Sequence, residues 1–168
     1  MAINAGADLV KDLYWGPNRV KRVHMGEELI FRAERAINST SQMLQTRTAS
    51  VTFDYELIDV NFYNNLVARL TYKPSSPDVT QVSLAVKIEL RRDDPAQSSD
   101  SQGGKSSGTK VFTRPTTACL AETSIKSPGN FRPNDDGQVY VKVVGDVLCE
   151  SDIPGVYGTV VLELFQTG

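Results

Sequence analysis

The side chains best suited to catalysis are scarce in this sequence. It contains a single histidine, His24, and two cysteines, Cys119 and Cys149, which lie thirty positions apart. A Ser-His-Asp triad needs a histidine beside an activated serine, and no G-x-S-x-G segment is present. Protein zinc sites use several histidines or closely spaced cysteines, which this sequence lacks. We therefore expect a non-enzymatic protein with no catalytic residues, no cofactor and no metal, in which His24 is structural.

Two carboxylate pairs and one glycine-rich segment are further candidates for chemistry. Asp93-Asp94 and Asp135-Asp136 lie among Gly and Pro residues, which is typical of solvated turns. A calcium site is the alternative for these pairs, because calcium tolerates irregular loops of oxygen ligands. The segment GGKSSG at 103–108 lacks the spacing, the preceding strand and the following helix of a phosphate-binding loop. We expect all three segments to be turns or loops.

Aromatic and basic residues gather near the start of the chain. Tyr14 and Trp15 are interleaved with Arg19, Lys21 and Arg22. Such a mixture can bind single-stranded nucleic acid, but nearby glutamates dilute the charge and the whole chain carries −2. Nucleic acid is therefore an unlikely partner, and a protein–protein contact with aromatic anchors and an arginine rim is favoured. The predicted contact residues are Tyr14, Trp15, Arg19, Arg22 and Phe31.

Most of the chain shows the two-residue alternation of β-strands. Segments 49–57, 65–73, 79–91, 138–150 and 157–167 alternate apolar with polar residues, and Gly/Pro-rich turns separate them. The inward faces are predicted to carry Val51, Phe53, Tyr55 and Leu57; Leu66, Ala68, Leu70 and Tyr72; Val82, Leu84, Val86, Ile88 and Leu90; Val139, Val141 and Val143; and Val160, Leu162 and Leu164. This pattern predicts an all-β fold, an antiparallel β-sandwich of jelly-roll or immunoglobulin-like type.

Two residues are expected to interrupt the strands. Pro115 cannot donate a backbone hydrogen bond, which predicts an edge strand or a break within 110–122. Gly145, inside an apolar run, is interpreted as the mark of a bulge.

The chain divides into three predicted parts. Residues 1–32 form an N-terminal arm with a small β-meander, because GPN at 16–18 and GEE at 26–28 are turn segments between short apolar runs. Residues 33–47 are expected to be a linker with a turn or two of helix. Residues 48–168 form the sandwich domain, in which 93–109 has no large apolar residue and is expected to be a flexible loop. A four-stranded meander is too small to stand alone, so this arm should be a docking element.

Length and composition fit an intracellular globular protein. The 168 residues are 40% hydrophobic and 23% charged, enough for one domain to fold without metals or disulfides. Cys119 and Cys149 are therefore interpreted as buried free thiols, with a disulfide as the alternative. No apolar run approaches the length of a membrane span. The start also lacks the pattern of a signal peptide, so we expect synthesis and assembly in the cytoplasm.

The stretch from Leu13 to Phe31 contains a short sequence repeat, called here the doubled phrase. Leu13-Tyr14-Trp15-Gly16 aligns with Val23-His24-Met25-Gly26. This doubled phrase resembles a short unit of bacteriophage virion proteins, especially minor tail and tail-tip proteins, although His24 stands where those proteins usually have Tyr. The resemblance is carried by Tyr14, Gly16, Val20, Val23, His24, Gly26, Leu29, Ile30 and Phe31. It implies a structural component of a virion, assembled in the host cytoplasm, whose partners are other virion subunits.

Two alternatives to a minor tail protein stay open. A viral capsid, head-decoration or matrix protein of this size would also be all-β with an N-terminal arm. A carbohydrate- or receptor-binding sandwich of a tail would bind a host surface glycan through exposed aromatic side chains. The candidates for sugar stacking are Tyr63, Phe131 and Tyr157.

Overall fold

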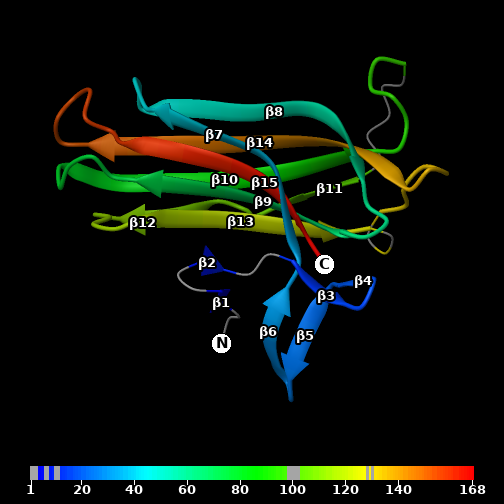
Figure 1. Cartoon of the computed structure of the whole chain (residues 1–168). Helices are drawn as coiled ribbons and strands as arrows, with labels where there is room; N and C mark the ends of the chain where they lie inside the picture. The colour runs from blue at the N-terminus through cyan, green and yellow to red at the C-terminus, as the bar shows by residue number, and fades with distance from the viewer. Residues whose placement is uncertain (1–3, 6–7, 10–11, 98–102, 128, 130) are drawn as a thin grey trace.

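Two antiparallel sheets packed face to face form the body of the chain (Figure 1). The structure, a computed structural model, describes residues 4–5, 8–9, 12–97, 103–127, 129 and 131–168. One sheet has the order β13-β9-β15-β7, and its strands are β7 (Glu34–Met43), β9 (Asn65–Lys73), β13 (Cys119–Lys126) and β15 (Thr159–Thr167). The other has the order β11-β10-β14-β8, with β12 also paired to β10; its strands are β8 (Thr48–Asp59), β10 (Val79–Arg91), β11 (Gly103–Ser106), β12 (Lys110–Thr113) and β14 (Gln138–Ser151). The predicted all-β antiparallel sandwich is confirmed.

The order of the strands identifies the sandwich as a jelly roll. From β7 to β10, and again from β12 to β15, each strand lies in the sheet opposite to the strand before it. Strands β11 and β12 both pair with β10 and act as one interrupted strand. Each sheet then has four strands, the eight-stranded double-sheet arrangement of a jelly roll. An immunoglobulin-like sandwich would keep its first two strands in one sheet.

The core lies between the two sheets and is supplied by alternate residues of each strand. The predicted inward residues of β9, β10, β14 and β15 are all buried. They form one continuous cluster with members from both sheets. Burial of each large aliphatic side chain contributes roughly 1.5–3 kcal/mol. Each of these strands buries one face against the core, and this burial produces the two-residue alternation from which the strands were predicted.

Gly145 of β14 does not mark a bulge, so that prediction was wrong. It pairs in regular register with Val86 and with Val51. A β carbon at position 145 would lie 3.0 Å from Leu70 Cδ1 and 3.2 Å from Leu162 Cδ1. The leucines of the opposite sheet therefore occupy the space that a side chain would need, and the glycine permits close packing of the two sheets.

The bulge occurs in β8 instead. Phe53 pairs with Val143, whereas Glu56 pairs with Val141, so the two residues between them oppose Lys142 alone. One extra residue shifts the alternation of the strand by one position.

The bulge changes which side chains of β8 reach the core. Val51 and Phe53, before the bulge, are buried as predicted. Tyr55 is only half-buried and Leu57 is 43% exposed, while Ile58 is buried. The prediction that Tyr55 and Leu57 share the inward face was therefore wrong. The ring of Tyr55 lies instead beneath charged side chains of the outer face, with Arg91 Cζ 4.8 Å from its centroid.

The segment expected to be a linker is a strand. Residues 34–43 form β7, which pairs along its length with β15. Every residue of β7 is exposed or half-buried, so the strand shows little apolar alternation in sequence. Its conformation is set by pairing with β15 and not by its own propensity.

The polar segment 93–109 is partly ordered into the sheet. Gly103–Ser106 form β11, paired with Lys87–Leu90 of β10; the expectation of a loop there was wrong, and 98–102 lie outside the described residues. The predicted break at Pro115 is confirmed, because β12 ends at Thr113 and β13 begins at Cys119. Within the described residues, no helix is long and apolar enough to cross a membrane.

The close packing of the two sheets predicts a sharp difference between neighbouring positions of β15. Leu162 is fully buried, whereas Val161 is half-buried on the outer face. We expect Leu162→Ala to lower the free energy of unfolding by about 2–5 kcal/mol, through lost burial and a residual cavity. Val161→Ala, the control, should lower it by no more than about 1 kcal/mol. Urea unfolding followed by circular dichroism measures both, and equal losses would contradict the assignment of faces.

Cys119 and Cys149 are both free and buried, as predicted. Burial raises the pKa of both thiols, and Cys149 Sγ lies 3.4 Å from the hydroxyl of Tyr72. We expect neither thiol to react with a thiol reagent at pH 8 in the folded chain, and both to react in denaturant. Because their pKa values are raised in the folded chain, the contribution of the thiols to the free energy of unfolding should fall only as the pH rises above the ordinary thiol pKa. Rapid reaction of the folded chain would contradict this burial.

Candidate protein-interaction surface

Two short hairpins precede the sandwich and lie together beside the end of the chain (Figure 1). One consists of β3 (Leu13–Trp15) and β4 (Asn18–Val20), and the other of β5 (Arg22–Met25) and β6 (Glu28–Arg32). We call them the N-terminal hairpins; two further short strands, β1 (Asn4–Ala5) and β2 (Asp8–Leu9), pair upstream. Each hairpin turns through two residues of which the first is glycine, Gly16 with φ +61° and Gly26 with φ +63°. A glycine in this position suits the tight turn that matches strand twist.

The four strands do not form one meander. Strands β3 and β4 make one two-stranded sheet, and β5 and β6 make another. The expected strands and turns are confirmed, but the expected single small sheet was wrong. A lone two-stranded hairpin is marginal in water, so each hairpin depends on contacts with the sandwich.

A small apolar cluster attaches the hairpins to the sandwich. Each hairpin contributes one cross-strand pair, Leu13 with Val20 and Val23 with Phe31. These residues pack with Ala33 and with Phe62 and Tyr63, which follow β8; we call the set the hairpin cluster. It is separate from the main core. The second hairpin has a bulge in which Ile30 is the extra residue. Val23 therefore pairs with Phe31 rather than with Ile30.

Arg19 attaches the first hairpin to Phe62 and Tyr63 of this cluster. Its guanidinium carbon lies 4.7 Å from the ring centroid of Tyr63 and 5.0 Å from that of Phe62. Its Nε donates a hydrogen bond of 2.9 Å to Asp12 Oδ1, and the hydroxyl of Tyr63 also lies 3.3 Å from that oxygen. Arginine stacked on aromatic faces and paired with a carboxylate is well suited to such a role.

The second hairpin is attached to the end of β15. Arg22 Nε and Arg32 Nε donate to the backbone oxygen of Gly168, at 2.7 and 3.1 Å. The backbone N–H of Gly168 in turn donates to Ala33 O at 2.8 Å. Burial, more than the neighbouring charge of Arg22, lowers the pKa of Arg32. These contacts join the second hairpin to Gly168, the residue that follows β15.

The predicted contact residues therefore divide into two groups. Arg19 and Arg22 have partners within the chain, and Phe31, with 4% exposure, is buried in the hairpin cluster. Tyr14 and Trp15, in contrast, are 61% and 83% exposed. Both lie in β3 next to the tight turn, on the hairpin that Arg19 and the hairpin cluster attach to the sandwich.

The other predicted candidates do not come together into a site. His24 is exposed on β5, opposite Leu29. Tyr63 and Phe131 are buried and Tyr157 is half-buried, so the aromatic side chains expected to stack on sugars are not displayed. Among the described residues, no group of three or more His, Cys, Asp and Glu side chains is arranged to hold a metal. Asp135, one of the predicted turn carboxylates, pairs with Arg92 at 2.9 Å.

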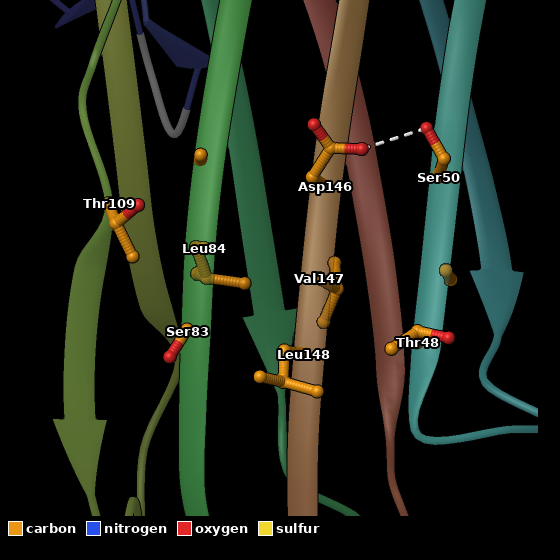
Figure 2. Close-up of a pocket in the computed structure, with 10 residues that line it drawn as sticks. Thr48, Ser50, Ser83, Leu84, Thr109, Asp146, Val147 and Leu148 are labelled. Carbon is orange, nitrogen blue, oxygen red and sulfur yellow. Dashed lines mark hydrogen bonds between the residues drawn. The ribbon is translucent and has the colours of Figure 1, made fainter.

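A groove crosses the outer face of the β8-β14-β10-β12 sheet, about 540 Å³ in volume, and sequence reasoning missed it (Figure 2). One cross-strand row places Thr48 beside Leu148 and Leu148 beside Ser83. The next row places Ser50 beside Asp146, with Ser50 Oγ donating to Asp146 Oδ1 at 2.8 Å. Small polar residues on the solvent-exposed face of a strand do not indicate a groove in the sequence. Only the pairing of the strands reveals it.

The break between β11 and β12 shapes one side of the groove. Ala85 lies on its floor, where β10 pairs with neither β11 nor β12. Thr109 lines the groove from the connecting segment, as Figure 2 shows. Gly108, with φ +69°, allows that segment to turn away from the sheet.

No protein-family model matches the chain, and no curated protein sequence matches it. The features of this chain that bear on its function are therefore the exposed aromatic hairpin, the groove and the topology of the sandwich.

The separation of the hairpin cluster from the main core predicts local unfolding. Phe31→Ala removes a buried ring, a change that costs about 3–5 kcal/mol in a packed site. We expect tryptic cleavage near Lys21 and Arg22 to become at least ten-fold faster, with little change in the melting of the sandwich. Leu29→Ala is the matched control, because Leu29 lies on the same strand but is 39% exposed. Global melting of the Phe31 variant without faster local cleavage would contradict this prediction.

Proposed function

We propose that this chain is a non-enzymatic structural subunit of a virus particle, assembled in the host cytoplasm, which acts by contacts with other subunits. The observation that carries the proposal is the strand order of the sandwich, β13-β9-β15-β7 facing β11-β10-β14-β8. This eight-stranded jelly roll is an architecture of viral capsid proteins. It favours a shell-forming role, as a capsid or head-decoration subunit.

A phage minor tail protein is the second candidate. It is supported by the twin N-terminal hairpins, whose doubled phrase resembles tail and tail-tip proteins. Because an exposed tryptophan beside an exposed tyrosine is typical of protein-contact anchors, the hairpin tip supports subunit contact in either role. Fold alone does not decide between them.

The form of the assembly distinguishes the two candidates. We expect the purified chain to self-associate in a concentration-dependent manner, measured by light scattering behind a size-exclusion column. Shells or sheets in negative-stain images would support the capsid or decoration role, and discrete rings or short fibres the tail role. A chain that stays monomeric at every concentration, alone and with virion extracts, would contradict both.

A further inference from the structure

We propose that the β3–β4 tip of one copy inserts into the outer-face groove of a second copy, with Trp15 as the inserted side chain. This contact names the partner and the residues of the self-association proposed above and rests on that function. The two surfaces differ, so the contact is head-to-tail: each copy has one tip to offer and one groove to fill. Contacts of this kind produce closed rings or extended arrays.

The tip is built as an anchor. Trp15 is 83% exposed and Tyr14 61% exposed, although an aromatic side chain can bury 150–250 Å² on binding. The hairpin that carries them is held in place by Arg19, which stacks on Phe62 and Tyr63. A tip that is already ordered loses little conformational entropy when it binds.

The groove has the size and the chemistry to receive such a tip. Its volume of about 540 Å³ lies within the range of about 300–1,000 Å³ of ordinary ligand sites. Ala85 on the floor and Leu148, which is 39% exposed, supply apolar surface. Asp146 and the hydroxyls of Ser50 and Thr48 supply acceptors. The indole N–H of tryptophan can only donate, so a groove walled by acceptors suits it.

A chain cannot fill its own groove. The hairpin cluster packs on Phe62 and Tyr63, just after the end of β8, whereas the groove lies over Thr48 and Ser50 at its start. From Ser50 to Asp59 the strand extends over roughly 30 Å. The tip is anchored at one end of the sandwich and the groove lies towards the other, so a groove that receives this tip belongs to a second copy.

The single tryptophan of the sequence makes the contact directly measurable. Trp15 is the only one in the chain, so the intrinsic indole fluorescence reports on the tip alone. We expect the wild-type emission to be that of a hydrated indole at low concentration, and to shift to shorter wavelength as the concentration and the scattering mass rise together.

Two complementary variants test both halves of the contact. Trp15→Ala has no tip anchor but an intact groove, and Leu148→Arg has a blocked groove but an intact tip. Each should self-associate at least ten-fold more weakly than the wild type. When Trp15→Ala, which contains no tryptophan, is titrated into Leu148→Arg, the emission of the latter should shift to shorter wavelength. The product should be a one-to-one dimer and nothing larger.

A control variant and a second groove variant distinguish loss of this contact from a general effect of the substitutions. Thr52→Arg places the same charge on the same exposed face, outside the groove, and should associate like the wild type. Ala85→Arg is a second groove variant if Leu148→Arg fails to fold. Assembly without a change in Trp15 emission, or unimpaired assembly of both groove variants, would overturn this contact and leave the structural role standing. Absence of any self-association would overturn this contact, and the virion-extract experiment would then decide the structural role.

Discussion

The pairing of β15 between β9 and β7 is the interaction on which most of the structure depends. Leu162 of β15 lies beside Leu70 in its own sheet, and both contact the space above Gly145 in the opposite sheet. The same strand supplies the ladder that holds β7 in an extended conformation. Gln166, fully buried, donates through Nε2 to the backbone oxygens of Asp59 and Tyr63, at 2.8 and 2.9 Å. One strand thus orders the core, an edge strand and the turn after β8.

The N-terminal hairpins depend on the same strand. The turn that Gln166 holds carries Phe62 and Tyr63, on which the hairpins pack. The end of β15 accepts hydrogen bonds from Arg22 and Arg32. A pair of hairpins too small to fold alone is therefore held by a central strand of the jelly roll, and its aromatic tip is free to face another molecule. The arginines expected at the rim of an interface are the residues that make this attachment.

The strands of the sandwich were predictable because both sheets bury one face against a common core. In β10 each residue of the inward face is apolar and each neighbour is half-buried or exposed, which produces a clear period of two. Strand β9 alternates in the same way except at Val67, which is also buried. Prediction failed where that condition is absent. In β7 neither face is deeply buried, and in β8 a bulge opposite Lys142 moved Tyr55 and Leu57 away from the core. At the candidate surface, Tyr14 and Trp15 were predicted as contact residues from their residue type and are exposed, but the groove left no trace in the sequence.

The sequence by itself determined the all-β class, the positions of most strands, and the two hairpins with their glycine turns. These properties are local, because alternation and turn chemistry depend on residues close together in the chain. Only the tertiary structure decided the jelly-roll order, the roles of Arg19, Arg22 and Phe31 within the chain, and the groove over Thr48, Ser83 and Leu148. Those features join residues that are distant in sequence, and strand register and packing, not composition, bring them together.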